Sequence, residues 1–190
     1  MGKILVFPVL LAAGCLISGL YGAVHNQISY TVSPEYFHAY KFVQFDIPAD
    51  LHNRVGASLV GWRASWRMGM CIGLPLLAVG LLFEDWKSYL AQSLGAFGVV
   101  AGTTLVTGLG ALAYASCTMN AANLPNYPIP ERVVDRVAFA RVGTMHNFSY
   151  LGGMLGVFTG SGYLIYAFVR RASSPRSAWR RKARNSRNEE

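Results

Sequence analysis

Four long apolar stretches, separated by polar segments, dominate the pattern of the chain. They cover residues 4–24, 61–83, 91–117 and 148–169. Each is close to the roughly 20 residues that an α-helix needs to cross the hydrocarbon core of a membrane. The second stretch is the weakest, because Arg63 and Arg67 interrupt its first half. The pattern predicts an all-α integral membrane protein, a four-helix bundle with a short interfacial helix on its outer side.

The composition argues for the same class of protein. Of the 190 residues, 53% are hydrophobic and 14% are charged, and the mean hydropathy is +0.31, whereas a soluble domain carries about 25% charged residues. The three cysteines lie in apolar stretches and are odd in number, which does not fit a disulfide framework or a thiolate metal site. The first apolar stretch is longer than the apolar core of a signal peptide, so we expect a retained membrane helix.

Positive charge is concentrated in residues 170–190, which hold eight of the 17 Lys and Arg residues. Basic residues beside membrane spans favour the cytoplasmic side. We therefore expect residues 1–169 to form one transmembrane bundle in the cell membrane, with both termini cytoplasmic and residues 170–190 as a disordered basic tail. Residues 25–60 and 118–145 become the outer regions. Nucleic acid is not an expected partner, because the basic excess is confined to the tail.

Small residues recur at four-residue spacing in three of the predicted spans. They are Gly69 and Gly73, Gly98 and Gly102, and Gly152, Gly156 and Gly160. Such faces let helices approach closely within a bilayer. The spacing fits packing within the chain and equally fits a homo-oligomer or a partner subunit of a membrane complex.

The first outer region carries a helix signal. Ser33 can cap a helix whose first position is Pro34 and whose first turn contains Glu35. The aromatic run that follows predicts a short helix over residues 34–45, lying in the interface or folded over the bundle mouth. Further helices are expected to begin near Asp50 and at Glu131 and to continue into the second and fourth spans.

This topology places all four histidines and most acidic residues on the outer side. Arg63 and Arg67 are four residues apart and share a helix face. They either snorkel to the interface or turn inward to pair with acidic groups. The second alternative predicts a polar pocket for a ligand, a lipid headgroup or a partner subunit. Its candidate residues are Gln27, Tyr30, Glu35, Arg63, Arg67 and Asp135.

A metal site is the rival interpretation of the same face. Glu35 and His38 stand three residues apart, a spacing that can supply an oxygen and a nitrogen ligand to a transition metal. If the first and fourth helices are neighbours, His25 and His146 lie at the same depth and could join them or hold a haem between two imidazoles. The alternative is that each histidine caps a helix or forms ordinary hydrogen bonds. Ser149 lies one turn from His146, but no hydrolase or protease signature accompanies it.

One segment is similar to a known group of sequences. Residues 21–37, followed by Lys41-Phe42 and Gln44-Phe45, carry a His-x-Gln-x-x-Tyr-x-x-Ser-Pro-Glu-Tyr-Phe signature. The signature resembles that of a group of uncharacterised bacterial four-span membrane proteins, and residues 61–66 resemble a second patch of that group. Arg67 departs from the group's pattern. The resemblance implies a bacterial origin and no particular activity, and it makes His25, Gln27, Tyr30 and Glu35 the first positions to test.

Overall fold

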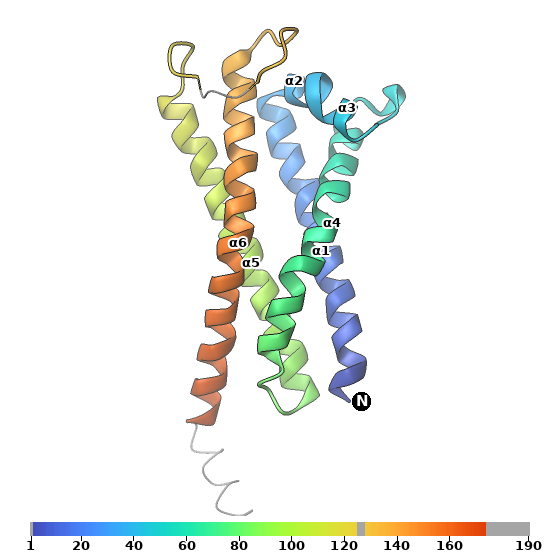
Figure 1. The fold of residues 1–190 in the computed structure, drawn as a ribbon, viewed down its shortest axis with the longest axis vertical. Helices are drawn as coiled ribbons and strands as arrows, with labels where there is room; N and C mark the ends of the chain where they lie inside the picture. Colours follow the sequence, from blue (N-terminus) through green and yellow to red (C-terminus); the bar gives the residue numbers. More distant parts are fainter. Residues whose placement is uncertain (1, 125–127, 174–190) are drawn as a thin grey trace, which may run out of the picture.

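The computed structural model describes residues 2–124 and 128–173, and within them it contains helices and no β-strand (Figure 1). Four helices are long. They are α1 (Lys3–Val32), α4 (Arg54–Gly80), α5 (Trp86–Thr118) and α6 (Arg136–Ala172). Each of them contains most of one predicted apolar stretch and extends beyond it toward the predicted outer regions or turns. The predicted all-α class is therefore confirmed.

The predicted membrane character is supported by three of these helices. The helices α1, α5 and α6 are long and apolar enough to cross a membrane. The helix α4 has 27 residues, but Arg63 and Arg67 lower its mean hydropathy, and it is not among the three. A membrane span formed by α4 stays a prediction.

Polar side chains determine where three of the long helices begin. The side-chain oxygens of Asn53, Asp85 and Asp135 each accept hydrogen bonds from backbone N–H groups in the first turn of α4, α5 and α6. Two of the helices begin later than predicted, because Asp50 and Glu131 do not cap them. Asp50 instead lies in a separate 3-10 turn, η2 (Ala49–Leu51).

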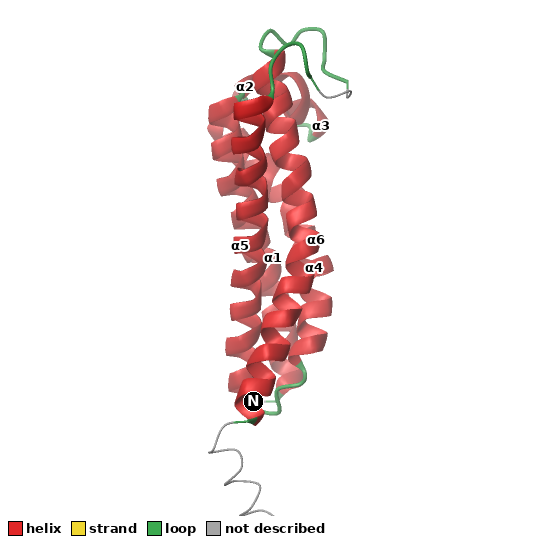
Figure 2. Ribbon diagram, turned by 90° about the vertical axis from the view of Figure 1, so that its left-hand side faces the viewer, coloured by secondary structure: helices red, strands yellow, loops and turns green. Residues whose placement is uncertain are grey.

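The long helices associate as two pairs that run along a common axis (Figures 1 and 2). The most extensive contacts join α1 to α4 and α5 to α6. In the first pair the backbones meet at Gly22 and Gly61, where a Cβ atom on either residue would collide with the backbone of the other. A Cβ atom on Gly69 would likewise collide with Gly14 and its neighbour. Close approach of α1 and α4 therefore requires glycine at these positions.

The predicted small-residue faces divide into packed and outward-facing ones. Gly152 and Gly156 of α6 lie against α5, where a Cβ atom on Gly156 would meet Val100. Gly98 and Gly102 of α5 have no other atoms within contact distance of an added Cβ. The stripe on α6 therefore serves packing within the chain, whereas the one on α5 faces away from it.

A short helical segment lies across the end of the helix pairs where α1 ends and α4 begins (Figure 1). It consists of α2 (Pro34–Tyr36), the π-helical turn η1 (Phe37–Lys41) and α3 (Phe42–Gln44). Ser33 caps it as predicted, since its hydroxyl accepts a hydrogen bond from the backbone N–H of Tyr36. We call residues 33–45 the end segment.

The aromatic side chains of the end segment are largely turned into the protein. Tyr36, Phe37 and Phe42 are buried in one apolar cluster with Val60 of α4 and Phe139 of α6. Burial of these rings removes apolar area from water at about 25 cal/mol per Å². The cluster therefore anchors the end segment to α4 and α6.

Two of the predicted features fall partly or wholly outside the described residues. Most of the basic tail, residues 174–190, lies outside them, as do residues 125–127 of the proline-rich turn before α6. The first residues of the predicted tail, Arg170 to Ala172, form the last turn of α6.

Candidate functional site

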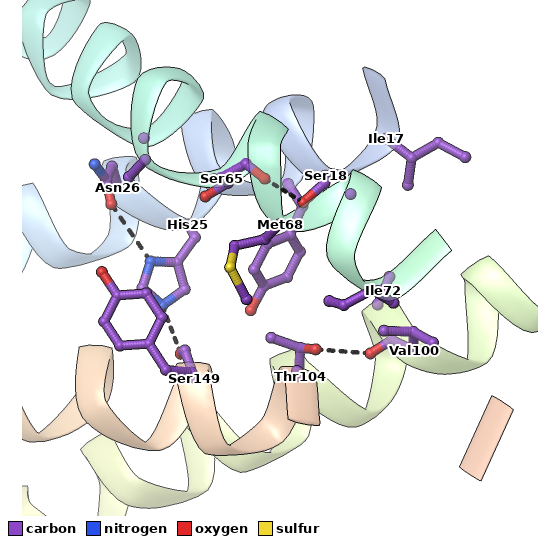
Figure 3. Close-up of a pocket in the computed structure, with 18 of the residues that line it drawn as sticks. Ile17, Ser18, His25, Asn26, Ser65, Met68, Ile72, Val100, Thr104 and Ser149 are labelled. Carbon is purple, nitrogen blue, oxygen red and sulfur yellow. Dashed lines mark hydrogen bonds between the residues drawn. The ribbon is translucent and has the colours of Figure 1, made fainter. Parts of the chain in front are cut away.

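A cavity of about 100 Å³ lies between the two helix pairs and opens to the surroundings. Side chains from all four long helices line it, and Lys41 and Phe45 of the end segment complete the lining. One part of the wall is apolar and includes Ile17, Ile72 and Val100 (Figure 3). The polar side chains of His25, His146 and Ser149 lie toward the end segment, where Tyr36 stacks on His146. Ser18 and Thr104 lie beside the apolar residues, and their hydroxyls donate to backbone carbonyls. The cavity therefore has an apolar body and a polar end.

The imidazole of His25 organises the polar end (Figure 3). Its Nε2 atom lies 2.9 Å from the hydroxyl oxygen of Ser149 on α6, and its Nδ1 atom lies 3.5 Å from the side-chain oxygen of Asn26. The Asn26 amide nitrogen donates to the carbonyl of Ala57, so its oxygen is the atom that faces His25. With the proton on Nδ1, Nε2 accepts the hydrogen bond of the Ser149 hydroxyl.

The second imidazole reaches across the helices in the opposite direction. His146 on α6 lies with its Nε2 atom 3.3 Å from the hydroxyl oxygen of Ser29 on α1. When the Ser29 hydroxyl donates to the carbonyl of His25 on its own helix, its oxygen accepts the hydrogen bond from His146. The His25 and His146 rings are 4.9 Å apart between centroids and nearly perpendicular. Each histidine therefore binds a serine of the other helix.

Burial explains why these groups pair so completely. His25 is 5% exposed and His146 is 7% exposed, and Tyr36 of the end segment stacks on the His146 ring at 5.1 Å. Burial of a polar group destabilises the folded protein unless the group finds a hydrogen-bond partner. The two histidine–serine bonds thus join α1 to α6, which otherwise share few contacts.

The Asn26, His25 and Ser149 side chains form a chain of hydrogen bonds that resembles a base-activated hydroxyl. Acyl transfer also needs donors that stabilise an oxyanion. Ser149 lies in the interior of α6, where the surrounding backbone N–H groups are used by the helix itself. A Cβ atom on Gly108 would strike its hydroxyl, so α5 closes one side. The arrangement suits ligand binding and helix pairing better than catalysis.

Lys41 brings a positive charge to the polar end. Its side chain is 8% exposed, donates a hydrogen bond to the side-chain oxygen of Gln44 at 2.9 Å and lies 4.5 Å from the centre of the Tyr40 ring. Within the described residues, no carboxylate lies within ion-pairing distance of it. Burial lowers the pKa of the Lys41 ammonium from 10.5 to about 8, because the charged form loses its hydration.

The predicted ligand-pocket residues do not line this cavity, and each has another role. Gln27 donates to the carbonyl of Arg54 and to Ser58. The Arg63 guanidinium donates to the carbonyl of Phe45 at 2.9 Å. The Arg67 guanidinium lies over the ring of Trp66, its own neighbour on α4. Neither arginine pairs with a carboxylate of the described residues.

The two acidic members of that predicted pocket serve α6. Both oxygens of Glu35 accept backbone N–H groups, those of Val134 at 3.0 Å and Asp135 at 2.8 Å. Asp135 caps α6. Glu35 thereby attaches the end segment to the start of α6, because its carboxylate accepts backbone N–H groups that have no partner within the helix and lies at the positive end of the helix dipole.

The four predicted metal ligands are separated into three places. His25 and His146 meet in the cavity, while Glu35 is occupied at the start of α6. His38 lies apart, 3.2 Å from the hydroxyl of Tyr30 and beside His52. Burial, and next the charge of His52, lower the pKa of His38. Among the described residues, no three His, Cys, Asp or Glu side chains are grouped so as to hold a metal ion.

A haem between His25 and His146 also does not fit this arrangement. The two rings are in direct contact at 4.9 Å, and both Nε2 atoms are bonded to serines. In a haem with two histidine ligands, the iron lies between the two ligating nitrogen atoms, and the contact between these rings leaves no space for it. The predicted proximity of the two histidines is found, but its role in the structure is hydrogen bonding.

Three important residues of the site escaped the sequence patterns. Lys41, Asn26 and Ser29 lie in the segment that carries the resemblance, but Asn26 and Ser29 stand at variable positions of its signature, and none of the three was among the candidate residues. A helical spacing signal did exist, because Ser29 follows His25 by four residues and Ser149 follows His146 by three. Such spacing places each serine beside a histidine of its own helix, whereas the structure uses it to reach the histidine of the other helix.

No protein-family model matches the chain, and neither a curated protein nor a solved structure shows significant similarity to it.

Proposed function

We propose that this chain is a four-span protein of the cell membrane that binds an amphipathic, lipid-like molecule in the cavity between its helix pairs. Three helices have the length and apolarity for a membrane span. The helix α4 packs along α1, which supports a fourth span in the same bundle. Arg63 lies toward the end segment, where it donates to Phe45. Its charge can therefore reach the interface instead of the hydrocarbon core.

The distribution of basic residues supports cytoplasmic termini. The start of α1 and the end of α6 lie at the same end of the molecule (Figure 1). That end carries Lys3, Lys87, Arg170 and Arg171, and the basic tail follows it in the sequence. Positive charge of this kind favours the cytoplasmic side. The end segment and the polar end of the cavity then face outward.

The cavity itself carries the proposal. Its apolar wall offers few partners to water, and such a wall favours an apolar occupant. Its polar end offers hydroxyl, imidazole and ammonium groups from Ser149, His25 and Lys41. A molecule with an apolar body and a polar head satisfies both parts at once, as is usual for sites lined by apolar side chains and a few placed polar groups.

Photolabelling tests this function. The purified protein in lipid nanodiscs is exposed to a long-chain alcohol that carries a diazirine in its chain, and the labelled peptides are identified by mass spectrometry. We expect labels on cavity residues such as Met68 and Ile72, beyond the labels on lipid-facing residues. Gly153→Leu should reduce the cavity labels, because a Cβ atom there meets only Ile72 at 3.7 Å and a larger side chain has space to enter the cavity.

The matched control is Gly162→Leu on the same helix. An added Cβ atom at Gly162 meets no atom within 4 Å, and the residue does not line the cavity. This variant should label like the unchanged protein. Equal loss in both variants, or an absence of cavity labels in the unchanged protein, would refute ligand binding in the cavity.

A further inference from the structure

Lys41 is the one lysine or arginine among the residues that line the cavity. Its ammonium group is held by the end segment, where η1 and α3 place it 4.5 Å from the ring centre of Tyr40, 5.6 Å from that of Tyr36 and 5.9 Å from that of Phe45. These rings attract a cation but carry no net charge. The positive charge therefore remains uncompensated within the described protein.

The hydrogen-bonding capacity of this ammonium is only partly used. An ammonium group has three N–H donors, and the structure assigns one of them to the side-chain oxygen of Gln44. A buried charge is stable when it is paired and fully hydrogen-bonded. Lys41 meets neither condition within the described residues.

The two carboxylates at the start of α6 are committed to other partners. Glu35 binds the backbone N–H groups of Val134 and Asp135, and Asp135 binds that of Ala138. Both carboxylates therefore stabilise the start of α6 and do not approach Lys41. An anionic occupant of the cavity would supply the negative charge that pairs with the protonated Lys41.

We infer that the cavity selects amphiphiles that end in a carboxylate, such as a long-chain carboxylic acid, and that Lys41 is the counter-ion of that carboxylate. The inference rests on the proposed function, since it names the head group of the molecule that the cavity binds. A single ammonium matches a single negative charge. The hydroxyl of Ser149 and the imidazole of His25 are neighbouring polar groups of the same wall.

A pair of matched probes tests this selectivity. One is the diazirine alcohol described above, and the other is the acid with the same chain. Near neutral pH, we expect cavity labelling by the acid to exceed that by the alcohol by about tenfold, the size expected of a hydrogen bond to a charged group. Lys41→Met should abolish the preference, so that the acid and the alcohol label the cavity to the same extent. Lys41→Arg should preserve the preference, because it keeps the charge.

Lys87→Met is the control for a general loss of positive charge. Lys87 is exposed beside Trp86 at the start of α5, at the opposite end from the end segment. This variant should retain the preference for the acid. If Lys41→Met does not fold, the unchanged protein decides the question: the preference should disappear well above pH 8, where Lys41 loses its proton.

The outcomes separate the inference from the proposed function. Equal labelling of the cavity by both probes, unaffected by Lys41→Met, overturns the carboxylate preference and leaves ligand binding intact. Absence of cavity labels with either probe overturns both. A diazirine phospholipid that labels the cavity in preference to the acid, and does so through Lys41, would contradict the assignment of a carboxylate.

Discussion

The Nε2 atom of His25 on α1 lies 2.9 Å from the hydroxyl oxygen of Ser149 on α6. This hydrogen bond joins the first and last long helices of the chain, 124 residues apart in sequence. It lies at the polar end of the cavity and has a counterpart in the bond between His146 and Ser29. The two bonds hold the helix pairs together beside the candidate site. His25, His146 and Ser149 therefore contribute both to stability and to the polar wall.

Removal of one partner of this hydrogen bond should lower the stability of the folded protein. We expect Ser149→Ala to lower the free energy of unfolding by about 1 kcal/mol, since His25 loses its partner in a buried site. The corresponding fall in melting temperature is roughly 2–4 °C for a chain of this size. The melting temperature is measured by heating the detergent-solubilised protein and monitoring the fraction that remains folded by size-exclusion chromatography. The double variant His25→Ala/Ser149→Ala should be less destabilised than the sum of the single variants, and strict additivity would argue against the bond.

The close approach of α1 and α4 should make the protein sensitive to larger residues at their contact. Gly61→Leu should prevent correct folding, because even a Cβ atom at this position collides with the backbone of Gly22. The destabilisation should be several kcal/mol, as for overpacking against a backbone that cannot move away. Gly98→Leu is the matched control, since its added atoms have open space around them. Monodisperse elution of both variants alike would contradict the described packing of the first pair.

The proposed topology can be tested by labelling of single cysteines. Asp50 and Glu84 are exposed at opposite ends of α4, one in η2 and the other in the turn before α5. In a background with Cys15, Cys71 and Cys117 replaced by alanine, Asp50→Cys should react with a membrane-impermeant maleimide added to intact cells. Glu84→Cys should react only after the membrane is opened. Reaction of both from the same side would overturn the membrane span proposed for α4.

The pH dependence of Lys41 follows from its burial. Its pKa is lowered from 10.5 to about 8, so between these values the unfolded chain binds more protons than the folded one. Stability of the ligand-free protein should therefore rise with pH in this window. Lys41→Met should remove that part of the rise. The other titratable groups facing Lys41 are His146 of α6 and Tyr36 and Tyr40 of the end segment.

Binding of the acid probe should show the opposite trend. A bound carboxylate raises the pKa of Lys41 again, so labelling by the acid should decline above pH 8 and labelling by the alcohol should not. Lys41→Arg provides the control, because a guanidinium stays charged throughout this range. A similar decline in that variant would show that another group is responsible.

The long helices could be predicted from the sequence because their signal is local. An apolar stretch of sufficient length identifies a helix without knowledge of its neighbours, and Ser33 and Pro34 identify the start of the end segment in the same way. Helix starts were less accurate, since Asn53 and Asp135, not Asp50 and Glu131, reach the free N–H groups.

The candidate site could be predicted only in part, because it is formed by contacts between segments that are distant in the sequence. The depth of His25 and His146 could be anticipated from topology, but their serine partners could not, since that choice depends on the rotation of α1 against α6. Lys41 looks like an ordinary surface lysine in the sequence. Its burial results from the π-helical turn η1, in which the N–H of Phe42 bonds to the carbonyl of Phe37, and from the rings around it.

The position of the bound molecule is the most direct test of the cavity as an amphiphile site. Two acid probes of equal length are compared, one with the diazirine beside the carboxylate and one with it near the end of the chain. The first should label residues at the polar end, such as His25 and Tyr150, and the second should label Ile17 and Phe97 in the apolar body. The same labels from both probes, or labels confined to the lipid-facing surface, would contradict the account.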